Sequence, residues 1–128
     1  MSAFEILAAG GLAAAIAVLA YILSGSPKVG SAALAAALGA GFAAYSAVTI
    51  ASEGVVQVWT NHTQNLWGVQ VWWDLLFAVG ISAFFIAPRA RAAGMKLAPW
   101  IALVAATASI GLLFMVSRLF WLESRAEA

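Results

Sequence analysis

The sequence of 128 residues contains no cysteine and only one histidine, His62. The absence of cysteine excludes disulfide bonds, thiolate catalysis and thiolate metal sites. A single histidine excludes a haem held by two imidazoles and leaves any metal site without a second imidazole ligand. The sequence therefore indicates no metal site. We interpret His62 as an exposed loop residue, and the alternative is a proton carrier or a ligand-binding residue.

Charged residues are also scarce. They make up 9% of the chain, hydrophobic residues make up 65%, and the mean hydropathy is +1.00. A soluble domain of this size could not cover so much apolar surface with so few charges, so we expect the solvent to be mainly lipid. The net charge is +1 and the sequence contains no basic patch, which excludes nucleic acid as a partner.

Four apolar runs are each long enough to cross a hydrocarbon core of about 30 Å at about 1.5 Å per residue. The predicted spans cover residues 3–23, 31–55, 67–86 and 97–122. They predict an all-α integral membrane protein in which residues 1–128 form a single domain of four transmembrane helices in an up-down bundle. The first run is longer than the apolar region of a signal peptide and follows an acidic head, so we expect it to be retained.

The positions of lysine and arginine predict an orientation. The turns after the first and third runs contain Lys28, Arg89, Arg91 and Lys96 and no acidic residue. The other side combines the head, the loop between the second and third runs, and the tail, and it holds four glutamates and one arginine. Because cytoplasmic loops are enriched in Lys and Arg, we predict that both termini lie on the non-cytoplasmic side.

Polar residues gather in the half of the bundle predicted to be non-cytoplasmic. Asp74 lies inside the third run, where a carboxylate needs a partner, a proton or a function. Arg118 in the fourth run leans toward Asp74, so a direct or water-bridged pair is one prediction; Arg118 could instead pair with Glu53 or extend to the interface. Glu53 and Gln57 share a helical face by their spacing. We predict a polar seam, either structural or ligand-binding, formed by Asp74, Arg118, Glu53, Gln57 and Gln70.

Five of the six tryptophans fall on or near the same side as the polar seam. Two of them flank the polar segment 59–67, which is typical of an interfacial loop because indoles favour the headgroup level. The tryptophans could form an interfacial belt, or they could form a wall for a flat ligand or pigment. The predicted aromatic wall consists of Trp59, Trp67, Trp72, Trp73 and Trp121.

Short motifs in the second half of the chain resemble those of a known protein family. They are Trp73-Asp74-Leu75-Leu76, an arginine-containing turn that ends in Gly94-Met95, and the segment 109–112. In these motifs residues 70–125 resemble a family of small bacterial four-helix membrane proteins of unknown function. The resemblance implies four helices and a location in the bacterial inner membrane, and it implies no activity.

We expect a small non-enzymatic membrane protein, an accessory or scaffold subunit that packs against other membrane proteins or forms a homo-oligomer. Glycines such as Gly39 and Gly41 allow helices to approach closely. The alternative is a binder or transporter of a small molecule, lipid, quinone or carotenoid in the polar, Trp-walled half. A membrane enzyme has less support, because no paired carboxylates, metal ligands or nucleophile triad are recognisable. The sequence indicates no particular cofactor.

Overall fold

The computed structural model describes residues 1–25 and 30–128, and these residues form six helices and no strand. The predicted all-α fold is therefore confirmed. The chain divides into two compact units, residues 1–30 and 31–128. Pro27 and Lys28 of the first predicted turn lie outside the described residues.

The first unit is a single helix, α1 (Ala3–Leu23), with the bounds that the first apolar run predicts. Ser2 and Glu5 form a capping box, in which the Ser2 hydroxyl accepts a hydrogen bond from the Glu5 amide at 3.1 Å and the Glu5 carboxylate accepts one from the Ser2 amide. Glu5 therefore caps the helix at its first turn. The 21 residues of α1 make it long and apolar enough to cross a membrane.

The second unit contains two more helices that are long and apolar enough to cross a membrane, α2 (Ala32–Glu53) and α4 (Leu66–Ala92). Gly54, with φ of 83°, ends α2 before the predicted boundary at residue 55. α4 continues past the predicted end at residue 86 and contains Pro88. Proline removes one helical donor, and α4 nevertheless continues to Ala92, where the Ala93 amide closes it by donating to the Arg89 carbonyl at 2.9 Å.

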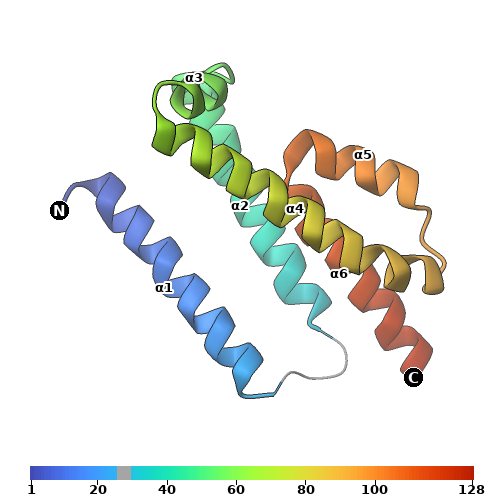
Figure 1. Ribbon diagram of the computed structural model, residues 1–128. Coiled ribbons are helices and arrows are strands. Elements are labelled where there is room, and N and C mark those ends of the chain that lie inside the picture. Colours follow the sequence, from blue (N-terminus) through green and yellow to red (C-terminus); the bar gives the residue numbers. More distant parts are fainter. Residues whose placement is uncertain (26–29) are drawn as a thin grey trace. The chain divides into compact units, whose positions relative to one another are not determined.

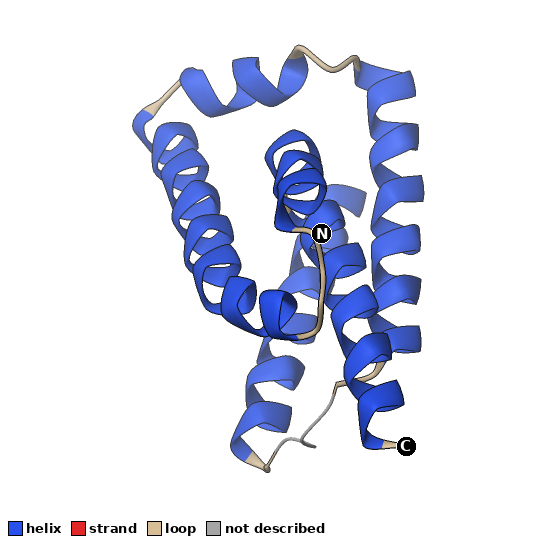
Figure 2. Ribbon diagram, turned by 90° about the vertical axis from the view of Figure 1, so that its right-hand side faces the viewer, coloured by secondary structure: helices blue, strands red, loops and turns tan. Residues whose placement is uncertain are grey.

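A short helix, α3 (Gln57–Thr63), occupies most of the segment predicted to be a loop. No glycine or proline lies within it, and Thr63 stabilises its last turn by donating from its hydroxyl to the Trp59 carbonyl at 2.9 Å. Figure 2 shows α3 lying across the ends of α2 and α4. Gln57 therefore belongs to a different helix from Glu53, and the two do not share the continuous helical face that their spacing predicted.

The fourth apolar run differs most from its prediction. Instead of one helix over residues 97–122, it forms α5 (Leu97–Thr107) and α6 (Ser109–Glu127), separated by Ala108. Ala108 has φ of 53° and ψ of −115°, a conformation that is unfavourable for any residue with a Cβ atom. Gly111 allows the tight reversal, because a Cβ at that position would lie 2.8 Å from the Val104 Cα. The chain therefore turns back on itself, and α6 runs beside α5 in the opposite sense (Figure 1).

Helix α6 packs against α2, α4 and α5 within the second unit. Along α2 the contact uses small residues: a Cβ at Gly39 would lie 3.3 Å from the Leu113 Cβ. Near the start of α2, the Ser117 hydroxyl donates to the Ala32 carbonyl at 2.8 Å. These contacts show that α2 and α6 are antiparallel and that Gly39 has the packing role that its size predicts.

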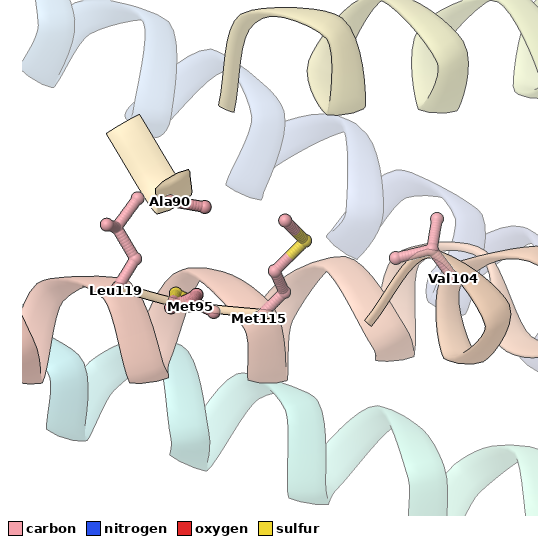
Figure 3. Close-up of a cluster of buried hydrophobic side chains, with 5 residues drawn as sticks. All are labelled: Ala90, Met95, Val104, Met115 and Leu119. Atoms are coloured by element: carbon pink, nitrogen blue, oxygen red, sulfur yellow. The ribbon is translucent and has the colours of Figure 1, made fainter. Parts of the chain in front are cut away.

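Five buried apolar residues join α4, α5 and α6, as Figure 3 shows. Met115 and Leu119 from α6 are fully buried, and Ala90 from the end of α4 lies against them. Between helices that lie in lipid, the hydrophobic effect contributes little, and close van der Waals packing of this kind is the main source of association. The core cluster consists of Ala90, Met95, Val104, Met115 and Leu119.

An ion pair closes the same end of the second unit. The Arg89 guanidinium of α4 donates to both carboxylate oxygens of Glu123 in α6, at 3.0 Å from Nε and 2.7 Å from Nη2. Bidentate geometry fixes the two helices in register as well as attracting them. The sequence-based topology put Arg89 and Glu123 on opposite sides of the membrane. The ion pair does not agree with that arrangement, because the reversal at Ala108 returns α6 to the end of α4.

Replacing Ala108 with glycine tests the strain at the reversal. Glycine adopts this conformation without a Cβ clash, so Ala108→Gly should stabilise the second unit by about 1 kcal/mol. The control is Ala102→Gly in the interior of α5, which should destabilise by about 0.5–1 kcal/mol because the helix loses a good helix former. Thermal unfolding followed by circular dichroism in mild detergent checks both. A lower midpoint for Ala108→Gly than for the parent protein would contradict the reversal.

Candidate ligand cavity

The second unit contains a partly open cavity of about 630 Å³. Its walls come from the second half of α2, from α3, from the middle of α4 and from the end of α5 with the start of α6. Most of the lining is apolar, including Ile50, Leu75 and Val79. The polar lining residues are Ser46, Thr49, Glu53, Gln57, Asn61, His62 and Thr107.

The cavity exists because α2 and α4 are joined at one end of the unit and separated at the other. At the first end α6 lies against both helices, through Ser117 on α2 and the Arg89–Glu123 pair on α4. At the other end α5 stops at Thr107, only 11 residues after it begins, so it fills only part of the space between them. The helix α3 lies across the ends of α2 and α4 and forms part of the cavity wall (Figure 2).

The position of α3 depends on close contacts with the first turns of α4. The Asn65 side chain caps α4 by accepting from the Gly68 amide at 2.7 Å. Gly68 lacks a side chain where one would collide with α3, since a Cβ there would lie 2.7 Å from the Asn61 carbonyl oxygen. The Trp72 ring packs edge-on to Trp59 at 6.2 Å and lies 5.5 Å from the His62 ring. These contacts hold the polar residues of α3 at the cavity.

The polar seam predicted from the sequence divides between two places. Glu53 and Gln57 line the cavity, whereas Gln70, Asp74 and Arg118 are not among its lining residues. Asp74 and Arg118 are both exposed. Among the described residues, the ion pair that forms is Arg89–Glu123. Arg118 instead stacks on Trp121, with its Cζ 4.5 Å from the ring centre. The structure therefore does not bring Asp74 and Arg118 together.

The tryptophans of the predicted aromatic wall also separate. Trp72 lines the cavity and Trp59 supports it from α3, but Trp73 packs against Phe77 and Trp67 is 75% exposed. Trp121 lies far along α6, between the guanidinium groups of Arg118 and Arg125 at 4.5 and 4.7 Å. Only the tryptophans on α3 and the facing turns of α4 are therefore placed to contribute to the cavity.

Phe42, Tyr45 and Thr107 are among the lining residues that the sequence analysis did not assign to the site. Phe42 and Tyr45 stack on each other at 6.2 Å between ring centres and precede Thr49 and Glu53 on one face of α2. Their three- and four-residue spacing was a usable signal. Thr107 carries no such signal, because its role depends on the helix break beside it: its hydroxyl accepts from the Gly111 amide at 2.9 Å and thereby caps the start of α6.

Comparisons with known proteins identify no relative. No family model, curated protein or solved structure matches the chain.

A glycine substitution tests the seating of α3. Gly68→Ala should force α3 away from α4, because the added Cβ would meet backbone atoms that cannot rotate aside. The control is Gly80→Ala on the same helix, where a Cβ would meet no described atom within 4 Å. Hydrogen exchange of the α3 amides should be at least about tenfold faster in Gly68→Ala, which corresponds to about 1.4 kcal/mol of lost local stability, and unchanged in Gly80→Ala. Equal exchange rates in the two variants would contradict the close contact.

Proposed function

We propose that the chain is an integral membrane protein that binds a small, largely apolar molecule in the cavity between α2, α3, α4 and α5. The observation that carries the proposal is the cavity itself. Its volume of about 630 Å³ lies in the range typical of small-molecule sites. Such sites combine apolar walls with a few polar groups that orient the ligand, and here most of the polar groups come from α3 and the adjoining turns of α2.

The proposed arrangement in the membrane has three crossings, by α1, α2 and α4, followed by a hairpin formed by α5 and α6 that enters and leaves on one side. Three observations support it: the length and apolarity of the three helices, the short α5, and the Arg89–Glu123 pair. Non-helical backbone at membrane depth is tolerated where it lines a cavity or is buried in protein. The break at Ala108 satisfies this condition, because Ala108 is one of the lining residues.

Charge supports an orientation for this arrangement. The end of the second unit that contains the Arg89–Glu123 pair also carries Arg91, Lys96 and Arg125, whereas among the described residues the α3 end carries Glu53 and no lysine or arginine. Because basic residues favour the cytoplasmic side, we place the end of α4 and the carboxyl terminus there. The sequence-based prediction put both termini on the non-cytoplasmic side, and this proposal moves the carboxyl terminus to the cytoplasmic side. The amino terminus stays non-cytoplasmic, because three crossings lie between the two termini.

An accessory or scaffold subunit is the second candidate function. The observation that favours it is apolar aromatic surface on α4 that no described residue covers, where Phe84 and Phe85 are 74% and 70% exposed and their rings pack edge to face. Lipid could cover the same surface. A partner protein would co-purify with the chain at fixed stoichiometry after mild solubilisation. Measurement of the particle mass would detect it.

Filling the cavity tests the binding function. Ala106 lines the cavity at the end of α5, so Ala106→Phe should place a ring inside it and remove the bound molecule. Ala102→Phe is the control, because Ala102 is an exposed residue of the same helix and is not a lining residue. Mass spectrometry of small molecules that co-purify with each protein checks the outcome. We expect a species that is present at about one per chain in the parent and in Ala102→Phe. In Ala106→Phe its amount should fall at least about tenfold, because the added ring occupies the space. Equal amounts in all three proteins, or none in any, would contradict the proposal.

A further inference from the structure

We propose that the cavity selects molecules with a positively charged nitrogen, such as a quaternary or protonated ammonium group on an apolar body. This inference rests on the proposed binding function. It is carried by the formal charge at the cavity and by the aromatic rings that line it.

Formal charge at the cavity has one sign. Glu53 contributes a carboxylate, and no lysine or arginine is among the described lining residues. Within residues 1–25 and 30–128 no basic group forms an ion pair with Glu53, since the pair that forms is Arg89–Glu123. A bound cation would therefore meet a carboxylate that no described basic side chain neutralises, whereas a bound anion would be repelled by it.

The end of α2 adds partial charge of the same sign. A helix carboxyl terminus carries about half a negative charge on its unpaired carbonyl groups, and basic residues usually offset it. Here the last turn of α2 contains no basic residue and ends with Glu53 and Gly54, both of which line the cavity. At the break around Ala108 the end of α5 and the start of α6 lie together with opposite partial charges, so they largely cancel. The start of α3 at Gln57 also lines the cavity and carries the opposite partial charge, so the sign of the potential is set by the Glu53 carboxylate rather than by the helix ends.

Aromatic rings supply a surface that suits an ammonium group. Phe42, Tyr45 and Trp72 all line the cavity, from α2 and α4. The electron-rich faces of such rings attract ammonium groups, including quaternary ones that have no hydrogen to donate, and this attraction strengthens where water is excluded. An ammonium group on an apolar body therefore matches both the carboxylate and the rings of this cavity.

Three probes with one phenylbutyl body test the inference. They carry a trimethylammonium group, a hydroxyl group or a carboxylate, and their binding to the full chain is measured by isothermal titration calorimetry in an uncharged maltoside detergent. We expect the ammonium probe to bind at least about tenfold more tightly than the alcohol, a difference of about 1.4 kcal/mol, and the carboxylate to bind most weakly. Glu53→Gln should remove most of the preference for the ammonium probe and leave the affinity for the alcohol unchanged.

Two further variants make the test specific. Asp74→Asn removes the same formal charge from a position outside the cavity lining and should leave the preference intact. Phe42→Leu should weaken binding of the ammonium probe more than binding of the alcohol. Equal affinities for the ammonium probe and the alcohol, unaffected by Glu53→Gln, would overturn the charge selectivity while leaving the binding function standing. Failure of all three probes to bind the parent protein would overturn both.

Discussion

The reversal of the chain at Ala108 is the constraint on which the rest of the second unit depends. It ends α5 after 11 residues and turns α6 back beside it, with the Gly111 backbone against Val104. Because α6 returns, Glu123 reaches Arg89, and Met115 and Leu119 are buried against the end of α4. Because α5 is short, the space between α2 and α4 near α3 stays open as a cavity. A continuous fourth helix would give none of these contacts.

The reversal is unfavourable locally and is stabilised by its surroundings. A residue with a Cβ atom at φ of 53° and ψ of −115° costs about 1–3 kcal/mol. Hydrogen bonds on both sides offset part of this, since the Ala108 amide donates to the Val104 carbonyl at 2.7 Å and the Thr107 hydroxyl accepts from the Gly111 amide. Strain of this kind is common at functional sites. Ala108 is itself part of the wall of the proposed binding cavity.

The sequence predicted the parts of the fold that depend on long apolar runs. Hydropathy located α1 with its bounds and the start of α2 and of α4 to within one residue, because a continuous apolar run is a strong local signal. The predicted end of the third run at residue 86 falls short of the end of α4 at Ala92. The break in the fourth run has no such signal, since Ala-Thr-Ala-Ser at residues 106–109 is compatible with a helix. Gly54 directly follows Glu53, and glycine commonly ends a helix. The predicted boundary of α2 was based on residue spacing and did not take this glycine into account.

The site was less predictable than the fold, for a related reason. Glu53, Gln57 and Trp72 were predicted as site residues, and all three line the cavity. The pairing of Asp74 with Arg118 assumed that the fourth run crosses the membrane in one straight helix, so it does not survive the reversal. Arg89 and Glu123 are separated by 34 residues and by the same reversal, so no local pattern in the sequence could pair them.

Because the chain contains no cysteine, thiol labelling can measure directly on which side of the membrane each end of the fourth run lies. Single cysteines placed at Ala92, Ala126 and Thr63 can be labelled with a thiol reagent that does not cross membranes, in intact cells and in inverted membrane vesicles. The reversal predicts that Ala92→Cys and Ala126→Cys are labelled from the same side, and that Thr63→Cys is labelled from the opposite side. Labelling of Ala92→Cys and Ala126→Cys from opposite sides would show that the fourth run crosses the membrane, and would contradict the reversal at Ala108.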